Sequence, residues 1–429
     1  MPTTPLRLGI AGLGTVGIGV VKIVQDHAAL IAARTGRDVV ITAVSARDRA
    51  KNRDADLSAY AWESDPAALA RRDDVDVFIE VMGGHDGPAK NATEAAIAAG
   101  KDVVTANKAL LAHHGQALAL AAEHAGLVIR FEAAVAGGIP VIKALTEGLA
   151  ANQIRRVMGV MNGTCNYILT RMQSAGLPYD QVFEEARQLG YLEADPNLDV
   201  GGIDAGHKLS LLAAIAFGTE VSFDEVELQG IGNVSIDDIR LAEDMGYRIK
   251  LLGVAQMTGR GLEQRMTPCL VPTASPLGQL QGGTNMVVLE GDSVGQIVLR
   301  GPGAGMGPTA SAVMADVCDI ARGLRLPTFG VPAAALAKPQ AAKAATPAPY
   351  YLRMTLLDKP GALAKIATCL GEAGISIDQM RQYGHVGVHA TVLIVTHKAT
   401  PGDVAHAIAS FVGTGVMVDA PVAIRIEEV

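Results

Sequence analysis

The stretch LRLGIAGLGTVG, residues 6–17, determines how the N-terminal part of the chain is expected to fold. An apolar run, predicted to be a strand, leads into Gly12, Gly14 and Gly17 and then into an apolar helical pattern. In a dinucleotide-binding turn, the first glycine permits the tight bend, the second lets backbone approach a pyrophosphate, and the third lets helix and strand pack closely. The helix N-terminus then offers unpaired N–H groups to phosphates. The pattern predicts nucleotide binding, with a purely structural glycine turn as the alternative.

Short apolar runs alternate with amphipathic helical patterns through the first 138 residues. This alternation predicts an α/β fold with a Rossmann-type, doubly wound, mainly parallel sheet over residues 1–138. The strands expected there are Leu6–Ala11, Val39–Ser45, Val75–Val81, Asp102–Thr105 and Leu127–Ala133.

From Ile139 the pattern mixes helices with more polar strands, which predicts an α+β substrate-binding and oligomerisation domain over residues 139–305. We expect a helix within residues 306–325 to return to the first domain. Residues 331–349 are rich in proline and alanine and form a predicted linker. Residues 350–429 follow the order β-α-β-β-α-β, which is typical of a ferredoxin-like module. Its expected strands are Tyr351–Leu357, Ile375–Gln382, His389–Thr396 and Met417–Ile426.

Composition narrows the class of protein. The chain has 429 residues, a net charge of −8 and no basic stripe, which argues against a nucleic-acid-binding protein. Four cysteines without a CxxC pair are typical of a reducing compartment. The N-terminus lacks the features of a signal peptide, and apolar stretches such as Leu209–Phe217 reach about half of the roughly 20 residues that a membrane span needs. We therefore expect a cytoplasmic protein that binds no membrane.

The end of the second predicted strand bears on cofactor choice. A fold that prefers NAD usually ends this strand with an acid that binds the ribose 2′-hydroxyl. Here the strand ends in Val44-Ser45-Ala46-Arg47, and Lys51 and Arg53 follow. We expect Arg47 to pair with a 2′-phosphate, so that NADP is accepted at least as well as NAD. The alternative is that Arg47 is a solvated surface residue.

Two lysines occupy informative positions. Lys108 follows a strand, at the sheet edge where open α/β folds bind ligands. Asp204 and Lys208 are one helical turn apart on a helix that is otherwise apolar, where an unpaired charge would be costly to bury. A substrate that carries both ammonium and carboxylate groups would supply partners. Upstream, Glu193, Asp195 and Asp199 add carboxylates, although a solvated acidic turn would look the same.

A set of longer motifs is shared with a known family. The segments GLGTVG, TANKALLA, FEAAVAGGIP, NGTCNYIL, EADPNLDVGGIDAGHKLSLLA and GPGAGMGPTASAV occur in order within residues 6–325, and this stretch closely resembles homoserine dehydrogenase. The C-terminal segments LDKPGAL and GISI resemble an ACT domain, so the layout is that of the monofunctional enzyme.

The resemblance implies a reaction and a set of roles. The expected reaction is the reversible reduction of L-aspartate 4-semialdehyde to L-homoserine with NADP or NAD. Lys208 matches the catalytic lysine, and Lys108 a lysine near cofactor and substrate. Glu193 and Asp204 match the acids that hold the amino end of the substrate, and Asp199 another acid of that motif. The remaining matches are cofactor contacts at Leu13, Thr15, Val16, Gly190 and Gly305, and ligands of a monovalent cation, usually sodium, at Glu132, Val135, Gly137 and Ile139.

The ACT-like segment implies feedback control by an amino acid, with L-threonine expected from the resemblance. Asp358, Gly361 and Asp378 stand at loop and strand ends where such domains hold amino acids. The alternative is a dimerisation module without a ligand, and family members are homodimers or homotetramers. Two other functions stay open. One is an aspartate-semialdehyde dehydrogenase, which would need a cysteine nucleophile such as Cys165, and the other is a non-catalytic amino-acid sensor.

Overall fold

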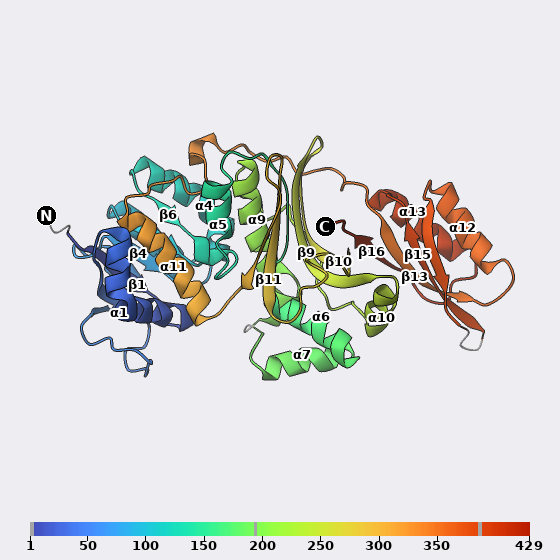
Figure 1. Cartoon of the computed structure of the whole chain (residues 1–429), viewed down its shortest axis with the longest axis horizontal. Helices are drawn as coiled ribbons and strands as arrows, with labels where there is room; N and C mark the ends of the chain where they lie inside the picture. Colours follow the sequence, from blue (N-terminus) through green and yellow to red (C-terminus); the bar gives the residue numbers. More distant parts are fainter. Residues whose placement is uncertain (1–3, 193–194, 385–387) are drawn as a thin grey trace.

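The computed structural model describes residues 4–192, 195–384 and 388–429. Three regions follow one another along the long axis of the molecule (Figure 1). The N-terminal region carries a parallel sheet, the middle region carries a mixed sheet, and a smaller module of two helices on a sheet lies at the C-terminal end. The predicted α/β fold class is confirmed.

Parallel strands in the order β3-β2-β1-β4-β5-β6 form the first sheet. Strand order reverses between β1 and β4, and this switch point is where a doubly wound sheet opens a crevice for a ligand. The strands are β1 (Leu6–Ala11), β2 (Val39–Ser45), β3 (Ala61–Glu63), β4 (Val77–Glu80), β5 (Asp102–Thr105) and β6 (Ile129–Arg130). The helices are α1 (Thr15–Thr35), α2 (Pro66–Ala70), α3 (Pro88–Ala98) and α4 (Lys108–His124).

Helix α11 (Met306–Ala321) packs against α1 although nearly 300 residues separate them, as the sequence had led us to expect. The approach is close at Gly19, where an added Cβ atom would lie 2.8 Å from the Cβ of Ala310. Buried Arg130 on β6 donates to Asp319 on α11 at 2.9 Å. The close approach at Gly19 and the ion pair between Arg130 and Asp319 hold α11 over the N-terminal sheet.

By length and composition alone, α1 could cross a membrane, which the sequence-based expectation missed. That expectation counted unbroken apolar runs, whereas α1 mixes small and apolar residues over its 21 positions. In this fold its buried face, which includes Val20, Val21 and Ile31, belongs to the core that also contains residues of β1, β2 and α11.

The middle region is built on long antiparallel strands. Its sheet continues into the C-terminal module, in the order β12-β11-β7-β9-β10-β16-β13-β15-β14, with β8 paired to β10. The strands are β7 (Ile154–Val160), β8 (Glu227–Leu228), β9 (Tyr247–Thr258), β10 (Gly261–Pro272), β11 (Thr284–Gly291) and β12 (Gly295–Pro302). The helices are α5 (Val141–Lys143), α6 (Gly163–Ala175), α7 (Tyr179–Gln188), α8 (Pro196–Val200), α9 (Ile203–Phe217) and α10 (Ile236–Asp244). Helix α9 lies between α4 and the sheet of the middle region. One of its faces therefore contacts the N-terminal region and another contacts the middle region (Figure 1).

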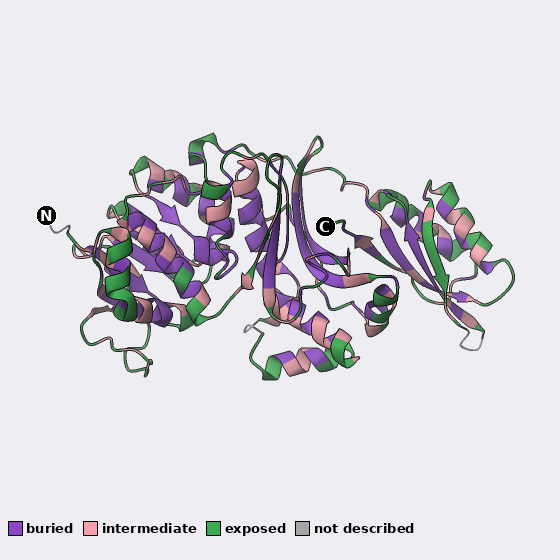
Figure 2. Cartoon of the chain, viewed as in Figure 1, coloured by how far each residue is buried: buried purple, intermediate pink, exposed green. Residues whose placement is uncertain are grey.

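The C-terminal module has the predicted β-α-β-β-α-β order. Its elements are β13 (Tyr350–Leu357), α12 (Ala362–Glu372), β14 (Ile377–Gln382), β15 (His389–Thr396), α13 (Pro401–Gly413) and β16 (Val422–Ile426). Strand β16 pairs in parallel with β10 at only two positions, Cys269 with Arg425 and Leu270 with Ile426. Most sheet strands are buried, whereas β14 is an exposed edge strand (Figure 2).

Three segments differ from expectation. The strand predicted at Leu127–Ala133 is limited to β6, because the chain turns into a 3-10 helix at Glu132–Ala134. The strand predicted at Met417–Ile426 begins at Val422, and Met417 makes only an isolated bridge to Leu356. The predicted linker runs along the middle region, where Leu262 bridges Ala341. Proline and alanine content indicated a poor core there, but backbone hydrogen bonds do not depend on side-chain type.

Candidate active site

The glycine turn has the geometry that its spacing predicts. Gly12 has φ of +105°, and an added Cβ would lie 2.6 Å from the carbonyl oxygen of Val81. A Cβ on Gly17 would lie 1.9 Å from the carbonyl oxygen of Gly12, so helix and turn fit only with glycine there. Gly14 is exposed, precedes the first turn of α1, and has no atom within 4 Å of its added Cβ. The turn thus presents open backbone, at the start of α1, to a ligand.

A cavity of about 630 Å³ opens beside this turn. Val16 of α1, Lys108 of α4, and Asp204 and His207 of α9 line it. The loop after β4 completes the wall with residues 81–85. The cavity therefore joins the switch point of the first sheet to the charged face of α9.

Lys108 is positioned by a buried polar network at the ends of β4 and β5. The carboxylate of Glu80, fully buried, accepts hydrogen bonds from the backbone of Met82 and from the hydroxyl of Thr105 at 2.7 Å each. Asn107 caps α4 by accepting from Leu110 at 3.0 Å, and its amide donates to the carbonyl of Gly84 at 2.7 Å. These contacts fix the first residue of α4, which is Lys108.

The charged residues of α9 find their partners within the protein. Lys208 Nζ lies 2.6 Å from Asp204 Oδ2 and 3.0 Å from the carbonyl oxygen of Met161. Lys108 Nζ lies 2.9 Å from the other oxygen, Asp204 Oδ1. The sequence placed Asp204 and Lys208 on one face correctly, but it assigned their missing partner to a substrate. The structure places Lys108 there.

Electrostatics favour the ionised form of Asp204. Burial by itself would raise the pKa of this carboxyl group, but the ammonium groups of Lys208 and Lys108 hold it well below its usual value. Asp204 is 6% exposed and Lys208 9% exposed. A buried carboxylate thus fixes the Lys208 ammonium group beside the cavity.

Sequence reasoning missed Asn162, which connects the two acids of the motif. Its side-chain amide donates to Asp199 Oδ1 at 2.9 Å and to Asp204 Oδ2 at 3.4 Å, while its oxygen caps α6. Asp199 is buried, on α8. The signal was present in the segment NGTC, since asparagine is a preferred residue before a helix. Its contact with α8 and α9 could not be read from local sequence.

Aromatic and imidazole rings form the wall opposite the lysines. His207 contacts Phe223 with ring centroids 4.2 Å apart and His113 at 5.5 Å, and His113 lies 4.6 Å from His85. Burial and the neighbouring His113 lower the pKa of His207 to about 4, so the ring is neutral near pH 7. The contact with Phe223 gives His207 a packing role.

The surroundings of Cys165 are not those of a catalytic nucleophile. Its side chain is buried, its thiol donates to the carbonyl oxygen of Asp199 at 3.3 Å, and burial raises the pKa of the thiol. Because the thiolate is the reactive form, this cysteine is unreactive in the described fold. The aspartate-semialdehyde dehydrogenase alternative thus loses its catalytic group.

A basic hollow of about 300 Å³ lies near the glycine turn. Arg53 donates to the carbonyl oxygen of Leu13 at 3.2 Å and stacks over Trp62 at 5.6 Å, and Arg49 stacks on the same ring at 5.8 Å. Lys51 also lines the hollow, whereas the exposed Arg47 is not among its lining residues. The structure therefore places Arg53, rather than Arg47, in contact with the fingerprint.

Other predicted cofactor positions lie apart from the cavity wall. Gly190 has φ of +74° at the exposed end of α7, and Gly305 has φ of +117° just before α11. Neither lines the cavity beside Lys108. Thr15 lies in the exposed first turn of α1, and Leu13 is buried. Glu193 lies outside the described residues.

The predicted cation ligands lie on one loop between β6 and α5. The carboxylate of Glu132 accepts from the backbone amides of Ile142 and Lys143 at 2.9 and 2.8 Å, and burial, with Asp316 nearby, raises its pKa to about 7. The carbonyl oxygen of Ile139 accepts from Val141 at 2.8 Å. Among the described residues, no backbone amide donates to the carbonyl oxygens of Val135 or Gly137. The donor set is oxygen only, which fits a hard monovalent cation.

Two of the three predicted effector residues meet at one cavity. Asp358 and Gly361 line a hollow of about 410 Å³ in the loop between β13 and α12. Gly361 has φ of +81° and precedes α12. Asp378, on β14, is not part of that lining, and its carboxylate lies 3.9 Å from His397 instead.

Family models match all three regions. A model described as homoserine dehydrogenase, NAD binding domain, matches residues 12–132, and one described as homoserine dehydrogenase matches residues 140–318. An ACT domain model matches residues 350–411. A Rossmann-type glycine turn beside the buried Asp204–Lys208 pair and the partly exposed Lys108 thus defines an oxidoreductase that uses a nicotinamide nucleotide. More particularly, the chain belongs to the homoserine dehydrogenase family.

Relatives and solved structures agree over nearly the whole chain. The homoserine dehydrogenase of Neisseria gonorrhoeae is 44% identical, with 95% of each chain covered. That of Pseudomonas aeruginosa is 41% identical over 99% of each chain. A crystal structure of a homoserine dehydrogenase from Thiobacillus denitrificans superposes with a TM-score of 0.93 at 38% identity, covering 100% of this chain and 99% of that one. A hyperthermophilic archaeal homoserine dehydrogenase in complex with NADPH has a TM-score of 0.62 at 25% identity, covering 76% of this chain and all of that one.

Proposed function

We propose that the protein catalyses the reversible reduction of L-aspartate 4-semialdehyde to L-homoserine, with Lys208 as the proton donor and acceptor at the substrate oxygen. The observation that supports this most directly is the placement of Asp204, Lys108 and Lys208 beside a cavity that also reaches Val16 of the glycine turn. The substrate of the reaction is an amino acid, and the enzyme accordingly serves amino-acid biosynthesis, in the threonine and methionine branches.

In this proposal the chain supplies orientation and charge. When bound, the nicotinamide nucleotide supplies or accepts the hydride at the reacting carbon of the substrate. The turn at Gly12–Gly17 and the N-terminus of α1 hold the pyrophosphate. Lys208 donates a proton to the substrate oxygen as negative charge develops there, and Asp204 and the carbonyl oxygen of Met161 keep its ammonium group pointed at that place.

The acids of the motif have separate tasks in the proposed complex. Asp204 already faces two ammonium groups, those of Lys108 and Lys208. A third ammonium group, that of the amino acid substrate, needs further negative charge nearby. Asp199 and Glu193 are proposed to supply this charge together with Asp204. Lys108 is proposed to contact both cofactor and substrate from the N-terminus of α4.

The cofactor is proposed to be NADP or NAD, with NADP accepted at least as well. Support comes from the basic hollow at Arg49, Lys51 and Arg53, since guanidinium groups match the geometry of a phosphate. Arg47 remains the residue proposed from sequence, and Gly190 and Gly305 complete the proposed cofactor contacts. We also propose that a sodium ion binds at Glu132, Val135, Gly137 and Ile139, where it would stiffen the loop beside Gly303 and the start of α11.

Regulation, assembly and location complete the proposal. L-threonine is proposed as the feedback inhibitor, held in the cavity at Asp358 and Gly361, with Asp378 on the neighbouring strand. The exposed edge strand β14 supports a homodimer or homotetramer through this module, since unpaired strand edges readily pair. The proposed location is the cytoplasm.

A direct assay tests the proposed reaction. Purified protein is mixed with L-homoserine and NADP or NAD, and the appearance of reduced nicotinamide is followed by absorbance. Reduction of either cofactor with homoserine, but not with L-malate or L-lactate, is the expected result. No reduction with homoserine under any cofactor would refute the proposed activity.

A further inference from the structure

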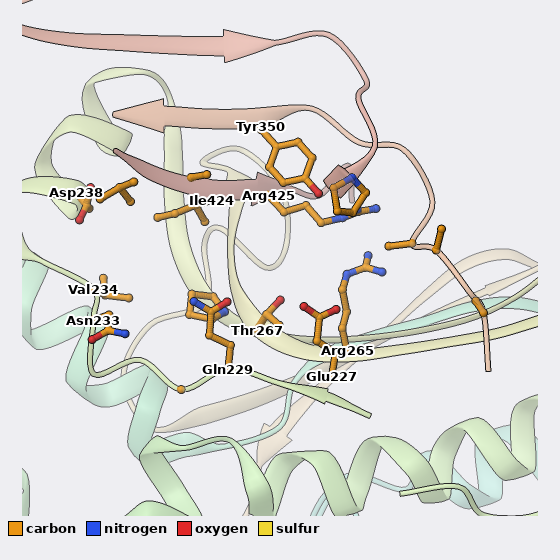
Figure 3. Close-up of a pocket in the computed structure, with 18 of the residues that line it drawn as sticks. Glu227, Gln229, Asn233, Val234, Asp238, Arg265, Thr267, Tyr350, Ile424 and Arg425 are labelled. Atoms are coloured by element: carbon orange, nitrogen blue, oxygen red, sulfur yellow. The ribbon is translucent and has the colours of Figure 1, made fainter. Parts of the chain in front are cut away.

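A cavity of about 650 Å³ lies at the junction between the middle region and the ACT domain (Figure 3). Lys208 and Asp358 are not among its lining residues. One wall comes from the middle region, where Glu227 and Gln229 stand on or beside β8 and Arg265 on β10. The other wall comes from the ACT domain, where Tyr350 begins β13 and Arg425 lies on β16. The cavity thus lies where the two-pair contact between β10 and β16 joins the domains.

Two buried guanidinium groups line the cavity. Arg265 is 3% exposed, and it contacts Glu263 and also Glu427 at 2.5 Å. The side chain of Arg425 is 10% exposed and donates to the same oxygen of Glu427 at 2.5 Å. Within the described residues, Arg265 Nε and Arg425 Nη1 have no hydrogen-bond partner. Because buried N–H groups are normally paired, these two donors show that contacts within the protein do not use the full hydrogen-bonding capacity of the guanidinium groups. Carboxylates are the acceptors that guanidinium groups match best.

The rest of the lining includes carboxylates and neutral amides, together with Lys343 from the segment that joins the two domains. Glu227 is exposed on the lower wall, with Gln229 and Asn233 beyond it (Figure 3). Asp238 closes the far end, where it already pairs with Arg353. An inorganic phosphate would face Glu227 unfavourably, and a simple cation would face the two arginines. Glu227 lies beside Arg265, its register partner between β8 and β10 (Figure 3). A free α-amino acid carries both charges a short distance apart, so its carboxylate fits the two arginines and its ammonium group the neighbouring Glu227.

The cavity wall is connected to the catalytic helix by short contacts. Gln229 donates its backbone amide to Met266 at 2.9 Å, and Ile231 donates to Val200, just before α9, at 2.9 Å. A Cβ on Gly230 would lie 2.3 Å from the carbonyl oxygen of Val200. One residue earlier, Leu228 faces α9, where a Cβ on Gly206 would lie 2.7 Å from its Cδ2 atom.

Because successive side chains of residues 227–229 point in opposite directions, these residues face two different sites. Glu227 and Gln229 face the junction cavity, while Leu228 contacts α9 at Gly206, midway between Asp204 and Lys208. A ligand that pulls β8 toward the ACT domain would draw Leu228 away from α9. Movement of Asp204 and Lys208 by even a small distance changes catalysis, because proton transfer depends on their position.

We propose that the junction cavity is a second amino-acid effector site, in which Arg265 and Arg425 hold the carboxylate and Glu227 the ammonium group of a free α-amino acid. Binding there alters turnover through Leu228 and α9. The site is separate from the cavity at Asp358 that the proposed threonine regulation uses.

Calorimetry on the full-length protein tests the proposal, with L-threonine, L-methionine, L-isoleucine and L-lysine as probes. At least one of them should bind at millimolar or lower concentration, and Glu227→Gln should weaken that binding ~10-fold, the effect of removing one charged contact. Glu372→Gln, which also removes one exposed carboxylate but lies outside both cavities, is the matched control and should leave the Kd unchanged. A second variant, Leu228→Ala, should retain binding and lose the effect of the ligand on kcat.

The proposal is overturned if none of the four amino acids binds. It is equally overturned if Glu227→Gln leaves the Kd unchanged, or if the control Glu372→Gln weakens binding as much as Glu227→Gln does. Binding is measured without turnover, so a protein that binds the amino acid but does not oxidise homoserine would contradict the proposed function and leave this inference standing.

Discussion

Lys108 and Lys208 come from helices that begin 95 residues apart, yet their ammonium groups contact opposite oxygens of the same carboxylate, that of Asp204. Helix α4 belongs to the nucleotide-binding region and α9 to the middle region. The carboxylate thus bridges the two regions at the point where cofactor and substrate are proposed to meet. Replacing Asp204 leaves the buried Lys208 ammonium group without its carboxylate, which is strongly unfavourable, whereas loss of either lysine leaves Asp204 with the other.

Replacing Lys208 with alanine should remove the proton donor. We expect kcat to fall by ~10²–10⁴-fold, which is the usual contribution of a positioned acid or base. NADPH affinity, measured by fluorescence titration, should stay nearly the same, because the glycine turn is separate from α9. Lys90→Ala, on the outer face of α3, is the control and should retain activity. A loss of only several-fold would assign the proton to another group.

Two glycines of the fingerprint should fail in different ways when they are replaced with alanine. Gly17→Ala places a Cβ 1.9 Å from the carbonyl oxygen of Gly12, so we expect a lower melting temperature and loss of cofactor binding. Gly14→Ala meets no atom within 4 Å, so the melting temperature should change little while cofactor affinity falls, because the pyrophosphate approaches there. Equal cofactor affinity in Gly14→Ala and the unmodified protein would contradict the proposed position of the pyrophosphate.

Arginine replacements should reveal how the 2′-phosphate is recognised. Arg53→Ala is expected to lower kcat/KM for NADP by ~10-fold relative to NAD, because a charged phosphate contact is lost. Arg47→Ala should lower the same ratio if Arg47 also reaches the phosphate, and Arg37→Ala, which binds backbone near the N-terminus, serves as the control. Steady-state kinetics with both cofactors give the ratios. If neither replacement changes them, cofactor choice does not depend on this hollow.

The buried His207 should make stability depend on pH. Its pKa is lowered to about 4 in the fold, against about 6.5 when unfolded, so between these values the unfolded chain binds a proton that the folded chain does not. The free energy of unfolding should therefore fall as the pH is lowered from 6.5 toward 4, and His207→Gln should lessen that fall. Urea unfolding at several pH values measures it, with His406→Gln on the exposed face of α13 as control. The same pH dependence in both variants would exclude His207 as the cause.

Local patterns predicted much of this fold because they report local structure. Neighbouring residues in the sequence determine three of these features: the turn at Gly12–Gly17, the ends of β5, and the i, i+4 spacing of Asp204 and Lys208. The contacts of Asn162 with α8 and α9, and of Arg53 with Leu13, join segments far apart in the sequence. Their partners are set by packing of whole domains, so only the structure could supply them.

The ACT segment was predicted as a module behind a linker, and its internal order followed from alternating apolar residues. That it extends the sheet of the middle region could not be predicted, because β10 and β16 are more than 150 residues apart and pair at two positions only. A pattern along one strand indicates which face is buried, but it does not identify the neighbouring strand.

The short parallel pairing between β10 and β16 determines how motion of the C-terminal domain can reach the middle region. Two residue pairs align the C-terminal strands with β10, and ion pairs between the domains, such as Arg265 with Glu427 and Arg353 with Asp238, add to this attachment. A change in the tilt of the C-terminal domain would therefore reach β10, the strand against which α9 packs.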